Sequence, residues 1–564
     1  MLPPQFPRIQ LPPSHAVLVL LALAFVAPGL VGHDPWRAFD VIAIEIAQQM
    51  HLSGDWIVPR LAGQPWLEDP PLYHWLALAF AKALGWLLGF HNAARIASGV
   101  AMLAALWFLY LAARHSALGT IAQARDGGAT KAERRGTGAA AALLLVGSVG
   151  LIVHAHEAVP DLAALAASCA ALCFLFIGKS KPVKAGLAFG GSLGAAFLST
   201  GPVVPAVLGA AVALAHLACD EWRTPRGLRF LGAAAAAFAL VAVSWPAALA
   251  LRAPELALAW WQGASQARGE FGANLRYYLA IASWFAWPAW PLAGWAAWTL
   301  RRQWRTPRIF VPLAAALFAL PAIAWAGPQQ DINAMVLLAP LALLGAHGVA
   351  RLRRGAANLL DWFGVMTFGF FSGLIWFCYV AVMTGLPPKV ANNFARSAPG
   401  FVAHFEPLPF VVAAALTLAW LYLVFFTAPS PTRGVTRWAA GVALLWACFA
   451  TLGLPWADHL KSYRGVALQL KSTLPAGAGC IAESELAAPQ RAALSFHAGI
   501  RTEPVQVSGG NTQGKPQPPK CRYLIVQGHP REERSPGAGW RKLADVGRPG
   551  DRGERYRLYR HGPG

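Results

Sequence analysis

Long apolar runs recur along this 564-residue chain, and they constrain its fold more than any other feature. A run of about 20 apolar residues is long enough to cross the hydrocarbon core of a membrane as a helix. Composition agrees, because 56% of the residues are hydrophobic and 24 are Trp. We therefore predict an all-α polytopic membrane bundle with about thirteen spans. They lie near residues 16–32, 95–113, 138–155, 160–177, 185–200, 202–219, 230–250, 277–299, 309–326, 333–350, 362–384, 406–427 and 436–456.

Lys and Arg residues stand in short clusters between the apolar runs, as is typical of loops kept in the cytoplasm. The cluster in residues 114–137 is therefore expected inside, and with a cytoplasmic N-terminus residues 33–71 lie outside. The apolar run 72–89 should then not cross, and we expect a helix lying in the membrane interface. The net charge of +21 is explained by cytoplasmic loops, so no nucleic-acid partner is expected. The same alternation places five further basic clusters inside, at 178–184, 221–229, 301–308, 351–354 and 431–437.

We predict two domains. Residues 1–456 form a transmembrane domain with an outer loop at 33–94, and residues 457–564, which are more polar in composition, form a small α/β domain on the outer side. Cys480 and Cys521 fall in this polar tail, where an oxidising compartment would join them in a disulfide. The other five cysteines lie in apolar runs and act there as small hydrophobes. Helices are expected at 457–474 and 484–499, the second opened by a Ser cap, strands at 479–483, 521–528 and 555–561, and a turn-rich loop at 508–519.

Polar residues gather at the predicted outer ends of the spans, where an ionisable group needs water or a partner. Several acids converging there suggest one water-filled site, although any single one can equally be a solvated loop charge, the interpretation we favour for Glu68, Glu255 and Glu270. The densest cluster is "HAHEAVPD", residues 154–161. A metal site there lacks a third ligand at standard spacing, so the sequence identifies no cofactor and leaves a divalent metal open. Asp161 would occupy the first turn of the next helix, which suits a site residue and a cap equally.

The segment "SGDWIVPRLAGQPWLEDPPLYHW", residues 53–75, closely resembles the signature of the aminoarabinose-transferase and protein-mannosyltransferase group of glycosyltransferase-C enzymes. The resemblance implies a multi-pass enzyme of the bacterial inner membrane. It would take a sugar from a polyprenyl-phosphate donor and pass it, with inversion, to a lipid, polysaccharide or protein acceptor on the periplasmic side. Further segments resemble the group in the same order, at 156–166, 196–208, 282–298, 336–346 and the tail from residue 461.

The resemblance also implies roles for individual residues. Asp40, in the first outer loop, and Asp161 are the expected catalytic acids. Arg60, Arg268 and Thr200 are expected at the donor phosphate. Asp55, within the signature, is expected to cap a turn or to pair with Arg60. The cavity is expected to include Asp34, Glu45, Tyr73, His156, Glu157 and Asp331.

Three positions depart from the pattern of the group: Phe39 replaces the first residue of an Asp-Glu pair, Asp69 replaces a Lys before the double proline, and Thr200 replaces a Lys before Gly-Pro. Asp40 could supply the missing acid with a helical shift of one residue, a rotation of about 100°. Asp34 could also reach the site from the preceding loop. The departures keep an alternative open, a catalytically degenerate member that binds lipid-linked glycan as a partner subunit. A lipid-glycan transporter is a further rival, which few charge pairs within the spans support.

Overall fold

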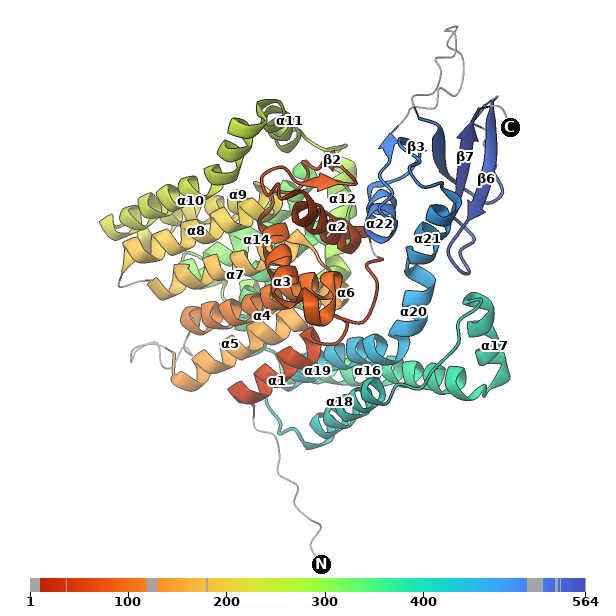
Figure 1. The fold of residues 1–564 in the computed structure, drawn as a ribbon. Helices are drawn as coiled ribbons and strands as arrows, with labels where there is room; N and C mark the ends of the chain where they lie inside the picture. The colour runs from red at the N-terminus through yellow and green to blue at the C-terminus, as the bar shows by residue number, and fades with distance from the viewer. Residues whose placement is uncertain are drawn as a thin grey trace, which may run out of the picture.

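The computed structural model describes residues 11–36, 38–118, 129–178, 181–504, 521–532, 536–537 and 539–562, so the loop expected at 508–519 lies outside the described residues. It is a helical bundle with a small C-terminal sheet (Figure 1), which confirms the predicted fold class. Within these residues eight helical segments are long and apolar enough to cross a membrane. They are α4 (Phe90–Ser116), α7 (Pro160–Ile177), α10 (Pro225–Arg252), α14 (Pro307–Ala326), η4 and α15 (Asp331–Val349), α16 (Arg354–Thr384), α18 (Pro407–Phe426) and the run Arg433–Thr473.

The remaining predicted spans are helical but shorter or broken, so the count of about thirteen is not confirmed. The segment 277–299 divides into α12 (Phe271–Phe285) and α13 (Ala289–Thr299), and 138–155 divides into α5 (Lys131–Val146) and α6 (Leu151–His154). The two breaks meet, because the N–H groups of Val149 and Gly150 donate to the carbonyls of Trp287 and Phe285, at 3.1 and 2.9 Å. Each break thus satisfies backbone groups that would otherwise be unpaired inside the bundle.

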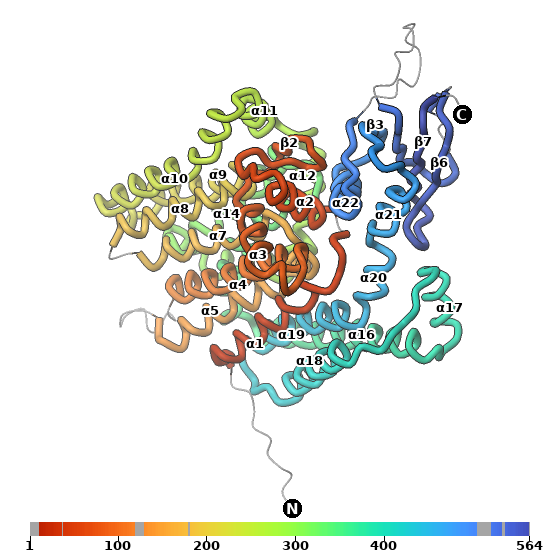
Figure 2. The backbone as a smooth tube through the Cα atoms, in the orientation of Figure 1, coloured from red at the N-terminus to blue at the C-terminus, as the bar shows by residue number. Residues whose placement is uncertain are grey.

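Close helix packing in the bundle depends on small residues. Helix α8 (Pro182–Thr200) packs against α7 and α10, as the tube in Figure 2 shows. A Cβ added at Gly190 would lie 2.0 Å from the carbonyl oxygen of Ala234, and one at Gly186 would lie 2.4 Å from that of Phe230. Only glycine permits this approach of the two backbones. Shorter apolar helices α1 (His15–Val26) and α9 (Val203–Ala218) complete this part, and α11 (Pro254–Ser265) follows α10.

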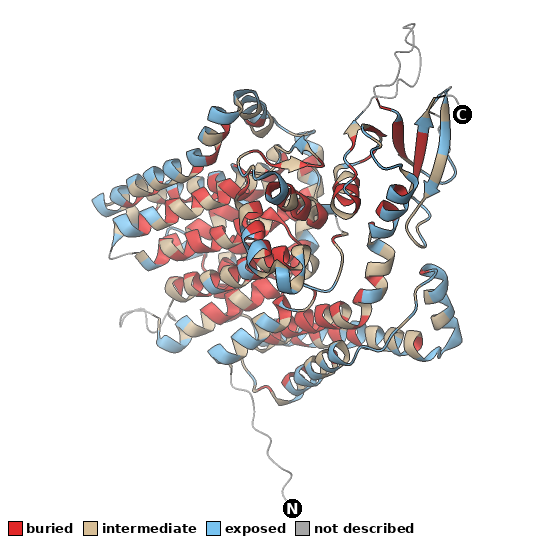
Figure 3. Cartoon of the chain, viewed as in Figure 1, coloured by how far each residue is buried: buried red, intermediate tan, exposed pale blue. Residues whose placement is uncertain are grey.

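Helix α2 (Ala38–Ser53) is mostly buried although it does not span the bundle (Figure 3). It packs against α3 (Leu72–Leu88) and against α22 (Ala488–Ala498) of the C-terminal region. The short hairpin of β1 (Arg60–Leu61) and β2 (Gln64–Pro65) connects α2 to α3. Two regions far apart in sequence therefore enclose α2 and fix its rotation about its own axis.

The C-terminal region forms a five-stranded sheet in the order β4-β3-β5-β7-β6, with β3 parallel to β4 and β5, and β7 antiparallel to β5 and β6. The expected strands appear as β3 (Ile481–Ser484), β5 (Tyr523–Gly528) and β7 (Arg555–His561), whereas β4 (Glu503–Pro504) and β6 (Trp540–Val546) were not predicted. The Cys480–Cys521 disulfide is confirmed.

Two local predictions for this region were wrong. The helix expected at 457–474 is two helices, α20 (Leu454–Lys461) and α21 (Arg464–Thr473), since Ser462 is in an extended conformation. Helix α22 has Ala487, not a serine, at its N-cap, with Pro489 in its first turn. The remaining elements are α17 (Pro388–Ser397), α19 (Arg433–Cys448), the π-helical turn η5 (Phe449–Gly453) before α20, and the 3-10 turns η2 (Asp220–Trp222) and η3 (Arg301–Gln303).

Candidate functional site

A cavity of about 450 Å³ opens where the start of α7 meets α2 and the C-terminal region. Its walls come from α2, the segment before α3, the start of α7, the turn between α8 and α9, the end of α11, and η4 (Asp331–Leu337). Ala488 and Pro489 at the start of α22 also line it, so the C-terminal region forms part of the wall. Its polar and tryptophan lining residues are Trp66, Glu68, Asp69, His74, Asp161, Ser168, Thr200, Trp260, Arg268, Gln330 and Asn333.

Three of the site residues expected from the sequence, Asp161, Thr200 and Arg268, meet in this cavity. Asp161 lies in the first turn of α7, directly after Pro160. A proline at the first helical position and an acid beside it both favour a helix start, so local sequence places this carboxylate. Thr200 is the last residue of α8, before Gly201, whose φ of +81° ends the helix.

Two acids without a predicted site role also line the cavity: Asp69, which the sequence left unassigned, and Glu68, which was expected to be a solvated loop charge. Burial, and after it the carboxylates of Asp161 and Glu68, together raise the pKa of Asp69 to about 7, while Arg268 acts in the opposite direction. Glu68 is exposed, as a solvated loop charge would be, but it borders the cavity as well. Asp69 directly precedes Pro70 and Pro71, which fix the chain before α3 begins, and this rigid position was the signal that could have identified it.

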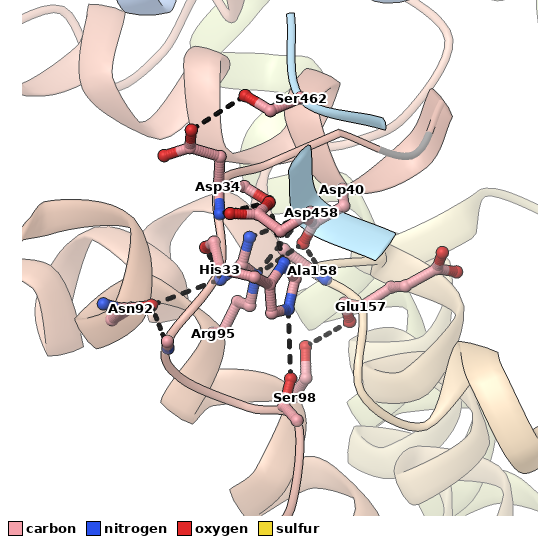
Figure 4. Close-up of polar contacts among 12 residues, drawn as sticks. His33, Asp34, Asp40, Asn92, Arg95, Ser98, Glu157, Ala158, Asp458 and Ser462 are labelled. Carbon is pink, nitrogen blue, oxygen red and sulfur yellow. Dashed lines mark hydrogen bonds and ion pairs between the residues drawn. The ribbon is translucent and has the colours of Figure 1, made fainter. Parts of the chain in front are cut away.

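Asp40 does not line the cavity, contrary to the expectation for a catalytic base. Its neighbour Phe39 faces the cavity instead, and a step of one residue turns a helix by about 100°. The Asp40 carboxylate accepts hydrogen bonds from Nε and Nη2 of Arg95 in α4, at 3.0 and 2.8 Å (Figure 4). Burial opposes ionisation of Asp40, but the Arg95 guanidinium more than compensates and holds the pKa of this carboxyl below its usual value.

The pair of Asp40 and Arg95 fixes the turn that leads into α7. Asp40 Oδ1 accepts the N–H of Ala158 at 2.8 Å, and Ser98 Oγ of α4 donates to the carbonyl of Glu157 at 2.7 Å (Figure 4). Asp161 follows three residues after Ala158. Asp40 is therefore in a position to orient the cavity acid rather than to contact a substrate.

The remaining predicted cavity residues are buried or paired outside the cavity. Asp34 donates its N–H to Asp458 at 3.0 Å and accepts a hydrogen bond from Ser462 at 2.8 Å. Glu45 is fully buried between α2 and α22, where it accepts a hydrogen bond from Gln49 at 2.8 Å. Burial raises the pKa of Glu45 to about 7.

Tyr73, His156, Glu157 and Asp331 likewise hold structural elements together instead of lining the cavity. The Tyr73 hydroxyl lies 2.6 Å from Ser98 Oγ, and the His156 ring nitrogens lie 2.6 and 3.0 Å from the carbonyl oxygens of Phe25 and Ile152. His154 lies between two acids, 2.7 Å from Glu157 and 3.5 Å from Asp331. These contacts tie α6 to the turn that precedes α7 and to η4. They also explain why the cluster at 154–161 is rich in polar residues.

Arg60 and Asp55 belong to the hairpin segment and not to the cavity. Arg60 Nη1 lies 3.5 Å from the carbonyl of Gly63 within the hairpin. Asp55 accepts the N–H groups of Ile57 and Val58 at 3.1 and 3.2 Å, which confirms the predicted turn cap. A phosphate role for Arg60 therefore has no geometric support.

In the described part of the chain, one group of three metal-type ligands lies close together. It is formed by Cys480, Glu503 and Cys521 in the C-terminal region, and none of the three lines the cavity. Two of these residues are joined in the disulfide. The cavity acids Asp69 and Asp161 do not belong to that group.

No family model matches this chain. It is 25% identical over 468 residues to an undecaprenyl phosphate-alpha-4-amino-4-deoxy-L-arabinose arabinosyl transferase of Aeromonas salmonicida, covering 78% of this chain and 76% of that protein. A transferase of the same name from Serratia proteamaculans is 25% identical over 437 residues, covering 71% and 72%. Among solved structures, ArnT from Cupriavidus metallidurans bound to undecaprenyl phosphate superposes with a TM-score of 0.66 at 18% identity, over 97% of this chain and 99% of that one.

Proposed function

We propose that this chain, a member of the polyprenyl-phosphate-sugar-dependent glycosyltransferases of glycosyltransferase-C fold, transfers a sugar from a lipid-phosphate donor to an acceptor at the membrane surface. The observation that carries the proposal is the cavity that brings Asp69, Asp161 and Arg268 together. The names of the similar transferases support undecaprenyl phosphate as the carrier lipid. We further place the cavity on the periplasmic side of a bacterial inner membrane, with the N-terminus in the cytoplasm.

The reaction is a direct displacement with inversion at the anomeric carbon. The acceptor oxygen forms a bond to this carbon from the face opposite the phosphate, and the bond between the carbon and the phosphate oxygen breaks. Polyprenyl phosphate leaves with the bonding electrons, and the acceptor proton passes to a carboxylate. A positioned general base contributes about 10²- to 10⁴-fold to such a step.

We assign the base to Asp69, with Asp161 as its partner. Burial and the nearby Asp161 charge together raise the pKa of Asp69 to about 7. A base whose pKa lies near the working pH is ionised in a useful fraction and still accepts a proton readily. Asp161 contributes by raising the basicity of its neighbour and by accepting a hydrogen bond from the substrate.

The leaving phosphate requires positive charge, which we assign to Arg268 and the start of α9. Arg268 lines the cavity, and so do the first residues of α9, Val203 and Val204. The N-terminus of a helix presents free N–H groups and the positive end of its dipole, which together favour a phosphate. Thr200, which lines the cavity one turn before α9, offers a hydroxyl to the same group.

The alternative of a degenerate partner subunit is not favoured, because the similar proteins are transferases over 71% or more of this chain. The acceptor class stays open among a lipid, a polysaccharide and a protein. Identifying the glycan that disappears from a deletion strain would decide among them.

The full-length chain, reconstituted in nanodiscs, tests the proposal. Radiolabelled undecaprenyl-phosphate glycosides serve as donors, and membranes of the deletion strain supply the acceptor. We expect Asp161→Asn to reduce transfer at least about 100-fold. The matched control Glu255→Gln changes an exposed acid outside the cavity and should leave transfer unchanged. Wild-type transfer by Asp161→Asn, or a deletion strain with an unaltered glycan profile, would contradict the proposal.

A further inference from the structure

His74 is a buried histidine, 1% exposed, that lines the cavity, and its ring nitrogen Nδ1 lacks a hydrogen-bond partner in the described part of the chain. The other buried histidines differ in this respect. His154 is paired with two acids, both nitrogens of His156 lie near carbonyl oxygens, and His347 lies 3.4 Å from Ser116.

The register of α3 directs His74 toward the cavity. Its neighbour Tyr73 points to α4, where its hydroxyl meets Ser98 at 2.6 Å, so the two consecutive side chains leave the helix in different directions. The Tyr73 contact fixes the rotation of α3. His74 is therefore held in place by its neighbour rather than by any hydrogen bond of its own.

A buried polar atom without a partner is rare in folded proteins and costs stability unless a ligand or water completes it. The cavity around His74 narrows the choice of ligand. It holds the carboxylates of Asp69, Asp161 and Glu68 against one arginine, Arg268, so an anionic group beside His74 would be repelled. A hydroxyl group suits the position, because it can donate to a carboxylate and also pair with a neutral imidazole.

Two aromatic rings strengthen this choice. Trp66 and Trp260 line the same cavity. Flat aromatic faces suit the apolar face of a sugar ring, while the polar groups that line the same cavity suit its hydroxyls. The lining is thus complementary to a pyranose or furanose ring, with the phosphate placed apart at Arg268.

We propose that His74 hydrogen-bonds a hydroxyl of the transferred sugar and so helps to determine which sugar the cavity accepts. This inference rests on the proposed function. His74 acts on binding of the glycosyl part of the donor, and it does not act on the phosphate or the lipid chain.

The test compares two lipids on the full-length chain in nanodiscs: undecaprenyl phosphate, and undecaprenyl phosphate carrying a pentose or hexose that the wild type transfers. His74→Phe keeps the ring size and removes both nitrogens. We expect it to weaken binding of the glycosylated lipid about tenfold, which corresponds to about 1.4 kcal/mol, and to leave the binding of undecaprenyl phosphate unchanged. His74→Asn restores a polar atom near the Nδ1 position and should recover part of the loss.

Donors lacking one hydroxyl each identify the group that His74 contacts. One of these deoxy donors should bind about equally to the wild type and to His74→Phe, because the missing hydroxyl and the missing imidazole remove the same hydrogen bond. The melting temperature gives an independent control. His74→Phe removes an unpaired polar group and should not lower it, whereas His156→Phe removes a ring placed between two carbonyls and should lower it.

The outcomes distinguish a failure of the proposed function from a failure of the inference about His74. If the wild type binds no undecaprenyl-phosphate glycoside of the panel, the proposed function fails, and this inference fails with it. If the wild type binds and His74→Phe binds equally well, the inference alone is overturned. It is also overturned if His74→Phe weakens both lipids to the same degree or lowers the melting temperature as His156→Phe does, since His74 would then have a structural role.

Discussion

Removing the Asp40 carboxylate tests whether this residue positions the cavity or performs chemistry. Asp40→Ala leaves the guanidinium of Arg95, which is 0% exposed, without its counter-ion. It also removes the acceptor for the N–H of Ala158. The two losses act on the same turn, the one that leads to Asp161.

The expected magnitude follows from burial. Breaking a buried ion pair by removing one partner costs about 3–5 kcal/mol, because the other charge stays buried and unpaired. Arg95→Ala leaves the Asp40 charge but keeps the bond to Ala158, so it should be the milder of the two. The double variant removes both charges, and we expect a coupling energy of about 0.5–3 kcal/mol, so that the double loss is smaller than the sum of the single losses.

Tryptophan fluorescence of the chain in detergent, followed through unfolding, measures stability, and transfer from a labelled donor measures activity. The positioning role predicts that stability and transfer fall together in Asp40→Ala and recover in part in the double variant. A catalytic base predicts the reverse pattern. Asp40→Asn and Asp40→Ala would then abolish transfer at normal stability, and a second change at Arg95 would rescue nothing. That result would refute the assignment drawn from the geometry.

Two further predictions concern groups with a raised pKa. Since the pKa of Asp69 is about 7, kcat/KM of the wild type should rise as the pH rises through about 7 and the carboxylate ionises. Asp69→Asn should lose most of the transfer activity together with this pH dependence. A wild-type pH profile in the variant would exclude Asp69 as the base. The pKa of Glu45 is raised from 4.5 to about 7 in the folded chain, so the unfolded chain gives up this proton at a lower pH than the folded chain does. The contribution of Glu45 to the free energy of unfolding is therefore fully present below about pH 4.5 and is lost as the pH rises through about 7. The loss amounts to about 3 kcal/mol, and Glu45→Gln should remove it, as pH-dependent melting curves of the two proteins would reveal; equal curves would contradict the buried position of this acid.

Much of the bundle is predictable from the chain because a membrane allows few solutions for an apolar run. The span predicted at 160–177 coincides with α7, and Cys480 and Cys521 form the expected disulfide. The breaks near Val149 and Pro288 were not predictable from hydrophobicity. Each break supplies backbone hydrogen-bond partners to the other, and this pairing joins segments more than 130 residues apart.

The candidate site was predictable in part for a similar reason. The position of Asp161 in the first turn of α7 could be predicted because a helix start is a local feature. The direction of the Asp40 side chain could not be predicted, since it depends on the rotation of α2, which contacts with α3 and α22 set from distant parts of the chain. Its partner Arg95 lies 55 positions away in another helix, and no local pattern joins the two.

The cavity suggests a physical explanation for the positions at which this chain departs from the signature of the group it resembles. Phe39 stands where the group has an acid, and Asp69 stands where it has a lysine, so the substitutions look damaging when they are taken one at a time. Both side chains line the same cavity. One wall therefore lacks the carboxylate of the group and another carries an additional one, which in the proposed mechanism keeps a base within the same volume at a different position. The lysine lost at position 69 leaves Arg268 and the start of α9 to hold the phosphate, and this is a weaker anion site than one with two basic side chains.

Such a cavity can retain transfer chemistry only if the phosphate lies further from Asp69 than from Arg268, because a carboxylate beside a phosphate would repel it. The sugar then lies between Asp69 and Arg268, which is the arrangement that an attack on the anomeric carbon from the face opposite the phosphate requires.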